Sequence, residues 1–325
     1  MRITATKAPA PPHDLGTSDA ALMELGEALR AAGYHFTTIT PATHERVNRR
    51  PACTQATDLR GVFGWSRPFG PGVLPARLVE LMDAAGVMHR SGELCRSLVR
   101  FSSYDGEIFV HSAFPTTAPD SVFFGPDTQR MADAASAAVE GRTLPLRRAV
   151  DIGCGTAAGA ITIAKLAPDA EVLAADINPA ALRFARLNAV LADTSNVRPC
   201  HSDLLNDVDG AFDLIISNPP FMIDPGGRTY RDGGPHGHEL PLAVVDAAAQ
   251  RLDAGGTLVL FSGTGIIDGR DPFRDAAAHR LGGAGLDWSY REVDPDVYSE
   301  ELDGPAYAYA ERIALVVLTA SRNGG

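Results

Sequence analysis

The sequence predicts an α/β fold with a mostly parallel sheet, preceded by a small N-terminal α+β domain of helices and a hairpin. From Arg147 onward, short apolar runs alternate with helical segments, which is typical of a sheet covered by helices on both faces. One apolar run, residues 149–152, ends in a glycine-rich turn that leads into a helix, an arrangement that binds nucleotides. Before residue 115, helical patterns precede two β-type runs. We therefore expect an accessory or substrate domain over residues 1–118 and a larger ligand-binding domain over residues 119–325.

The first domain begins with a proline-rich stretch. Residues 1–16 predict an irregular lead-in because prolines interrupt any regular pattern. Leucines spaced three or four residues apart then predict helices over residues 20–32 and 75–85. We expect a third, short helix around Glu93.

A hairpin follows these helices. The β-type runs 97–104 and 107–111 are separated by Asp105–Gly106, and an Asp-Gly pair is a strong signal for a two-residue hairpin turn. The outline is that of a winged helix, which suggests nucleic-acid binding. Residues 1–120, however, hold 12 Lys/Arg against 12 Asp/Glu. This balance favours shaping a substrate pocket or self-association, with a homodimer as one form.

Charge and composition exclude several classes of function. The net charge is −11, and residues 121–325 carry 17 basic against 28 acidic side chains, which makes a nucleic-acid partner unfavourable. No stretch reaches the ~18 to 20 apolar residues of a membrane span, and the N-terminus lacks the apolar run of a signal peptide. We expect a cytoplasmic protein without a membrane partner. The four cysteines lie far apart, so neither a metal site nor a disulfide framework is predicted.

The second domain alternates strands and helices. In such a sheet the ligand binds at the carboxyl ends of the strands. The strands are predicted over residues 149–152, 172–176, 212–217, 257–262 and 312–318, and the helices over 129–140, 160–166, 179–192 and 240–252.

The glycine turn by itself suggests a dinucleotide site. Gly153-x-Gly155-x-x-Ala158 fits the fingerprint G-x-G-x-x-G/A, and Asp176 lies about 20 residues further on, where an acid would bind ribose hydroxyls. An NAD-dependent dehydrogenase is therefore the first alternative. Asp151 argues against it, because a pyrophosphate gains nothing from an additional negative charge in front of the turn.

A second motif changes the interpretation. Asn218–Pro219–Pro220–Phe221 follows a strand, and together with Asp151, the glycines and Asp176 it resembles the class I S-adenosylmethionine-dependent N-methyltransferases. Within that branch the sequence is similar to the release-factor glutamine N5-methyltransferases and the related small domain methyltransferases. The resemblance covers residues 121–262 and implies a Rossmann-like methyltransferase fold with S-adenosyl-L-methionine as cofactor and S-adenosyl-L-homocysteine as product.

The resemblance also implies roles for single residues. Phe124 to Thr128 resembles a loop that covers the cofactor in the family, and residues 232–237 resemble its glycine segment after the Asn-Pro-Pro-Phe motif. Cofactor contacts are expected from Asp151, Gly153 and Gly155 at the methionine part, Asp176 at the ribose, Asp203 at the adenine, and Thr128 and Asn218 nearby.

The catalytic residues are expected in the Asn-Pro-Pro-Phe motif. The side-chain oxygen of Asn218 and the carbonyl of Pro219 would accept N–H bonds from the acceptor and aim its nitrogen at the methyl group, a gain in positioning. Phe221 would stack on the planar acceptor, with additional cation–π attraction if that group is charged.

The acceptor is predicted to be a planar or amino nitrogen, with a small molecule such as a free amino acid bearing a guanidinium or amide side chain as first choice. Residues 292–311 contain seven acids and no Lys or Arg. A solvated loop is one interpretation; a lid that binds a guanidinium is the other. A protein glutamine and a guanine N2 of ribosomal RNA are the alternative acceptors. The substrate contacts expected are Phe124, Tyr230, Glu239, Tyr298, Glu300, Glu301 and Asp303.

Overall fold

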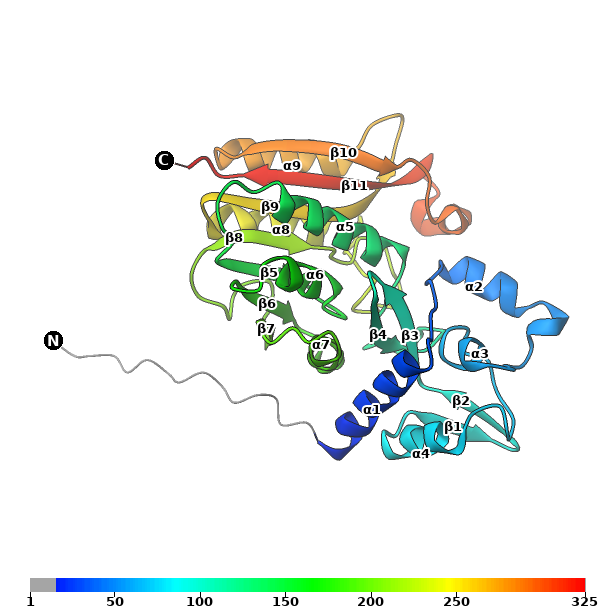
Figure 1. Cartoon of the computed structure of the whole chain (residues 1–325). Coiled ribbons are helices and arrows are strands. Elements are labelled where there is room, and N and C mark those ends of the chain that lie inside the picture. Colours follow the sequence, from blue (N-terminus) through cyan, green and yellow to red (C-terminus); the bar gives the residue numbers. More distant parts are fainter. Residues whose placement is uncertain (1–15, 325) are drawn as a thin grey trace.

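The computed structural model describes residues 16–324, so the predicted lead-in lies, except for Gly16, outside the described residues (Figure 1). Its centre is a seven-stranded sheet in the order β10-β11-β9-β8-β5-β6-β7. Strands β9, β8, β5, β6 and β7 are parallel, while β11 and β10 continue the sheet antiparallel. This confirms the predicted Rossmann-like, mostly parallel sheet. The strands are β5 (Arg148–Ile152), β6 (Glu171–Asp176), β7 (Val197–His201), β8 (Phe212–Ser217), β9 (Leu252–Ile266), β10 (Asp287–Asp294) and β11 (Arg312–Ser321).

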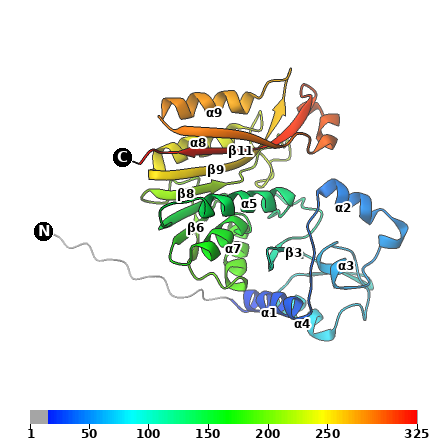
Figure 2. The same cartoon turned by 45° about the horizontal axis from the view of Figure 1, so that its top comes forward.

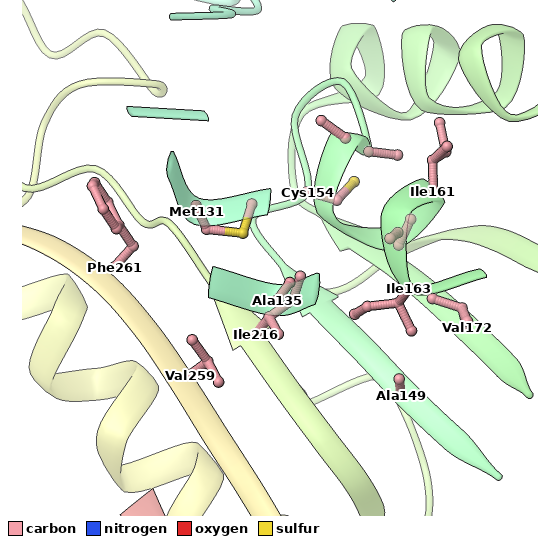
Figure 3. Close-up of a cluster of buried hydrophobic side chains, with 14 of the residues drawn as sticks. Met131, Ala135, Ala149, Cys154, Ile161, Ile163, Val172, Ile216, Val259 and Phe261 are labelled. Atoms are coloured by element: carbon pink, nitrogen blue, oxygen red, sulfur yellow. The ribbon is translucent and has the colours of Figure 1, made fainter. Parts of the chain in front are cut away.

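Helices cover both faces of the sheet. Figures 1 and 2 show α8 and α9 on one face, with α5, α6 and α7 on the other. Apolar side chains fill each interface, and Figure 3 shows one layer, where Met131 and Ala135 of α5 lie near Ile216 and Val259 of the sheet. Burial of this apolar surface stabilises the sandwich by about 25 cal/mol per Å². The helices are α5 (Pro126–Glu140), α6 (Ala158–Leu166), α7 (Pro179–Leu191), α8 (Glu239–Arg251) and α9 (Pro272–Gly283).

The N-terminal part has its own apolar core, which also includes side chains of α7. Phe36, Phe63 and Phe101 are fully buried in it, and Phe184 and Leu187 of α7 belong to the same cluster. The part therefore packs directly on α7. Its elements are α1 (Thr17–Ala31), α2 (Pro41–Asn48), η1 (Pro51–Cys53), α3 (Leu59–Phe63), α4 (Ala76–Ala84), β1 (Met88–Ser91), β2 (Leu94–Ser97), β3 (Val99–Tyr104) and β4 (Glu107–Ser112).

Two local expectations have opposite outcomes. The Asp105–Gly106 turn joins β3 to β4 as predicted, with φ of 48° and 78° at its two positions. The prediction of a short helix around Glu93 is wrong. β1 and β2 pair there as a hairpin, with Gly92 at φ 61°. Cross-strand pairing outweighs the local pattern at this position. The boundary after residue 118 stays a prediction.

The chain between β10 and β11 folds back as two short 3₁₀ helices, η2 (Ser299–Asp303) and η3 (Pro305–Tyr307). The buried hydroxyl of Tyr307 accepts a hydrogen bond from the backbone N–H of Ile223 at 2.9 Å. This bond ties the segment to the chain that follows β8. Within residues 16–324, no helix is both long and apolar enough to span a bilayer.

Candidate active site

The ends of four neighbouring parallel strands form the site. Ile152 of β5 lies beside Ala175 of β6 and Ser217 of β8, and Asp176 lies beside His201 of β7. The segments that follow these strands therefore converge at one edge of the sheet, as expected for a doubly wound fold. They line a cavity whose walls include Gly153, Gly155, Thr156, Asp176, Ser202, Asp203, Asn218, Pro219 and Phe221.

The glycine turn, which is predicted to bind the cofactor, forms one side of this cavity. Gly153 and Gly155 have φ of 69° and 52°, a region that glycine enters without steric cost. The N–H of Gly155 donates to Oδ2 of Asp176 at 2.9 Å, and the N–H of Asn178 donates to Oδ1 at 2.9 Å. Burial raises the pKa of Asp176, while these donors favour its ionised form. The carboxylate is thus held against the turn.

A buried amide anchors the turn to the N-terminal hairpin. Asn188 of α7 is fully buried, and its Nδ2 donates to the carbonyl oxygens of Thr156 and Val110 at 3.0 and 3.1 Å. Its Oδ1 accepts the N–H of Val110 at 2.8 Å. One side chain therefore joins β4 to the chain just before α6. Pro41, at the start of α2, also lines the cavity, so the N-terminal part contributes to its wall.

Asp151 requires a correction. It is buried and lies behind the glycine turn instead of lining the cavity. Its Oδ2 accepts the N–H of Ala160 at 3.1 Å, and its Oδ1 has no partner among the described residues. Burial raises the pKa of Asp151 to about 7. Its position places this carboxylate at the N-terminal end of α6, where the helix dipole favours negative charge.

Asp203 and Thr128 both line the cavity, as predicted. Asp203 is exposed and follows β7 after Ser202. The hydroxyl of Thr128, in the first turn of α5, accepts the N–H of Gly125 at 3.2 Å. The structure thus brings together every expected cofactor residue except Asp151.

The Asn-Pro-Pro-Phe motif follows the strand next to the one that leads into the glycine turn. Asn218 directly follows β8, where Ser217 Oγ donates to the carbonyl of Ile152 at 2.7 Å and ties the two strand ends together. The Nδ2 of Asn218 faces Oδ2 of Asp127 at 3.5 Å, a long contact. Its Oδ1 is buried and has no partner among the described residues. Burying an oxygen without a hydrogen bond costs free energy, so this atom is positioned to accept a hydrogen bond from a ligand.

Phe221 forms the next part of the wall. Its ring lies 6.2 Å from that of Tyr298, centroid to centroid, at an angle of 47°. A Cβ added to Gly263 of β9 would lie 2.4 Å from the Phe221 ring. Glycine at this position therefore makes room for the aromatic side chain.

The predicted substrate aromatics are divided by the structure. Tyr230 lines the cavity, donates its hydroxyl to the carbonyl of Thr116 at 3.0 Å and stacks on Phe123 at 5.5 Å. Phe124 lies instead in the core, where it stacks on Phe109 and is 1% exposed. Phe123, its neighbour, takes the place on the cavity wall. The sequence could not distinguish two adjacent phenylalanines that point to opposite sides.

The structure also differs from the prediction that acidic residues of a lid bind a guanidinium. Glu300, Glu301 and Asp303 do not line the cavity, and Glu301 pairs with Arg231 at 2.5 Å. Arg231 and Tyr298 line this wall instead. Glu239 pairs with His236 at 2.6 Å at the start of α8 and likewise lies off the cavity wall. Glu300 and Asp303 are exposed to solvent, where ionised carboxylates are well hydrated.

Comparison with known proteins agrees with the motifs. Residues 133–265 match the family described as "Methyltransferase small domain". The release factor glutamine methyltransferase of Deinococcus radiodurans is 35% identical over 165 residues, 47% of this chain and 55% of that protein. Ribosomal RNA small subunit methyltransferase C of Haemophilus influenzae is 38% identical over 113 residues, 34% of this chain and 31% of that protein.

These matches cover only part of each protein, and the chain spans about half the length of the release-factor enzyme. Among solved structures, a ribosomal protein L11 methylase from Lactobacillus delbrueckii subsp. bulgaricus is 22% identical, covers 62% of this chain and 81% of its own, and has a TM-score of 0.41. The family match sets aside the NAD-dependent dehydrogenase alternative. Residues 133–265 thus match the methyltransferase small domain family, in agreement with the predicted resemblance to the class I S-adenosylmethionine-dependent methyltransferases.

Proposed function

We propose that this protein transfers the methyl group of S-adenosylmethionine to a planar –NH₂ nitrogen, and that the acceptor is the side-chain amide of a protein glutamine. The buried, unpaired Oδ1 of Asn218 carries the proposal. Asn218 precedes Pro219, whose backbone carbonyl is a second acceptor, and both residues line the cavity. An –NH₂ group has two hydrogens, which match two acceptor oxygens at this position.

The cofactor half of the cavity suits the methyl donor. Asp176, whose carboxylate already accepts the backbone N–H groups of Gly155 and Asn178, would accept hydrogen bonds from the ribose hydroxyls. Asp203 would accept a hydrogen bond from the adenine amino group. Gly153 and Gly155 have no side chains, so the methionine part of the cofactor could approach their backbone closely. Bound S-adenosylmethionine supplies a methyl group on a positively charged sulfur, which is the electrophile.

The protein's own residues act mainly by positioning. Hydrogen bonds to Asn218 Oδ1 and the Pro219 carbonyl would orient the acceptor nitrogen in line with the methyl carbon and the sulfur. Transfer of the methyl group would replace its C–S bond by a bond to the acceptor nitrogen, which would release one proton to solvent. Correct orientation of two reactants can supply about 7–11 kcal/mol of barrier lowering in the best cases.

The protein-glutamine acceptor is favoured by the relatives. Most of the similar curated proteins are named release factor glutamine methyltransferases, from Deinococcus radiodurans to Salmonella typhimurium. Glu300, Glu301 and Asp303 do not line the cavity, which removes the main argument for a lid that binds a small cationic acceptor. A ribosomal RNA guanine is disfavoured by the acidic balance of residues 121–325.

A guanidinium-bearing small molecule is the second proposal. One observation favours it: Asp127, an acidic residue, lines the same cavity as Asn218 and faces its Nδ2 at 3.5 Å. A guanidinium is planar, carries –NH₂ groups and is attracted to a carboxylate. The two acceptors therefore differ in charge at the position of Asp127.

Transfer of radiolabelled methyl tests both. The substrates are a release factor with a Gly-Gly-Gln motif, the same factor with that glutamine changed to alanine, free arginine, and citrulline as its uncharged isostere. Label on the first protein alone supports the protein-glutamine acceptor. Label on arginine but not on citrulline supports the second proposal. Label on none of the four contradicts both, and no binding of S-adenosylhomocysteine contradicts methyl transfer altogether.

A further inference from the structure

The first turn of α5 places a carboxylate against the proposed catalytic amide. Asp127 is 8% exposed, and its Oδ2 lies 3.5 Å from Nδ2 of Asn218. The two residues are 91 positions apart in the chain and come from different elements. Only the folded structure brings them together.

The position of this carboxylate is set by its surroundings. A Cβ at residue 125 would lie 2.6 Å from Oδ1 of Asp127 and 2.3 Å from the Phe123 ring, so Gly125 leaves the space that the carboxylate occupies. Pro126 begins α5 and restricts φ at its first position. The carboxylate lies at the N-terminal end of the helix, where the dipole favours its charged form.

The chemistry of the pair decides which way the amide points. The nitrogen and oxygen of an asparagine side chain are similar in size, so a half-turn about the last bond exchanges them with little steric effect. An ionised carboxylate accepts hydrogen bonds but donates none, and it therefore favours Nδ2 of Asn218 and repels Oδ1. In the structure Nδ2 faces Asp127, while Oδ1 is buried without a partner.

We propose that Asp127 is a positioning residue that fixes the Asn218 amide with Nδ2 toward α5 and Oδ1 toward the methyl acceptor. The inference rests on the proposed function only for the identity of the acceptor. With the amide reversed, an N–H of Asn218 would face the N–H of the acceptor, and the productive hydrogen bond would be lost. The 3.5 Å contact is long, and such bonds in ligand-free sites shorten when the substrate binds.

The pair should respond to pH. Burial raises the pKa of Asp127, and the hydrogen bond from Asn218 partly opposes this shift. The other ionisable groups that face the carboxylate are Arg130 on α5 and Tyr298, and Arg130 is itself paired with Asp294 of β10 at 3.0 Å. Protonated Asp127 can donate a hydrogen bond, so it no longer selects one orientation of the amide.

The first experiment needs no acceptor. The side-chain NH₂ signals of Asn218 are identified in ¹H–¹⁵N spectra by their loss in Asn218→Asp. We expect them to move with pH as Asp127 titrates, and to lose this dependence in Asp127→Asn. Asp133→Asn is the matched control, because Asp133 is an exposed carboxylate on the same helix. Signals that ignore both pH and Asp127→Asn would overturn the proposal.

The second experiment measures transfer. With whichever substrate the wild type methylates, Asp127→Asn should lower kcat about tenfold, and S-adenosylhomocysteine affinity should stay within about twofold. The decrease of the wild-type rate at low pH should be absent from the variant. Asp127→Ser serves if Asp127→Asn does not fold, since a hydroxyl also donates and accepts. An unchanged kcat overturns the proposal, whereas a wild type inactive on every substrate overturns only the proposed function.

Discussion

The two halves of the cavity are built on different principles. On the cofactor side, the glycine turn and Asp176 come from one β-α-β unit, and their polar groups already bond one another. On the acceptor side, Asp127, Asn218 and Tyr298 come from three distant segments, and Asn218 Oδ1 has no partner. A preformed half suits a constant cofactor. In the other half, the hydrogen bond to the unpaired oxygen forms only when a suitable methyl acceptor binds.

The largest effect is expected from Asn218→Ala. If this side chain serves only the acceptor half, kcat should fall about 100-fold or more, because a positioned hydrogen bond is lost in the transition state. The affinity for S-adenosylhomocysteine should change by less than about threefold. Single-turnover rates and calorimetric titration measure the two quantities, with the exposed Asn206→Ala as control. A joint loss of binding and rate would show that the halves are not separate.

Asp176→Ala tests the cofactor half. The variant loses the carboxylate that holds the N–H groups of Gly155 and Asn178, and hydrogen bonds to charged groups contribute about 1.5–3 kcal/mol each. We expect 10- to 100-fold weaker binding of S-adenosylhomocysteine by titration. Asp169→Ala, an exposed acid before β6, should bind like the wild type. Normal affinity in Asp176→Ala would contradict the assignment of the ribose site.

Gly263→Ala tests the acceptor half through Phe221, which packs against Gly263. The added methyl group would lie 2.4 Å from the Phe221 ring and must displace it, and overpacking typically costs about 1–3 kcal/mol. We expect kcat/KM for the acceptor to fall about fivefold to tenfold while cofactor affinity is retained. Gly282→Ala adds the same methyl group into open space on α9 and should leave activity unchanged. Equal effects of the two variants would argue against a role for Phe221.

The smallest effect concerns Asp151, which lies behind the cofactor half. Its pKa is raised to about 7 by burial, so between its ordinary value and pH 7 the folded state holds a proton that the unfolded state releases. The free energy of unfolding should therefore decrease as pH rises through this range. Asp151→Asn keeps an oxygen for the Ala160 N–H and removes the titration. The difference in Tm between variant and wild type should grow by a few degrees from pH 5 to pH 8, and a constant difference would refute this account.

Much of the fold could be predicted because its signals are local. Buried strands such as β11 contain continuous apolar runs, and the turn at Asp105–Gly106 is encoded in two residues. The missed elements are short or polar. In α2 only His44 is buried, and β7 is partly exposed along most of its length. Such segments depend on tertiary packing for their stability, so their own sequence carries little signal.

The site was predictable to the same degree. Asp176, the glycines and Asn218 follow strands in a recognisable order, and the parallel register then brings them together. The role of Asp127 beside Asn218 had only a weak signal, an acid directly after Gly-Pro at the start of a helix. The ion pair between Arg231 and Glu301 had no signal in the sequence.

The sequence by itself determined the match to methyltransferases, the glycine turn and the Asn-Pro-Pro-Phe motif, because each depends on residues close together in the chain. Only the tertiary structure decided which side chains face the cavity. It buried Phe124 and exposed Phe123 to the cavity, moved Asp151 behind the turn, and paired Asp127 with Asn218. The direction of a side chain depends on what packs against it from distant segments, and that information is absent from local spacing.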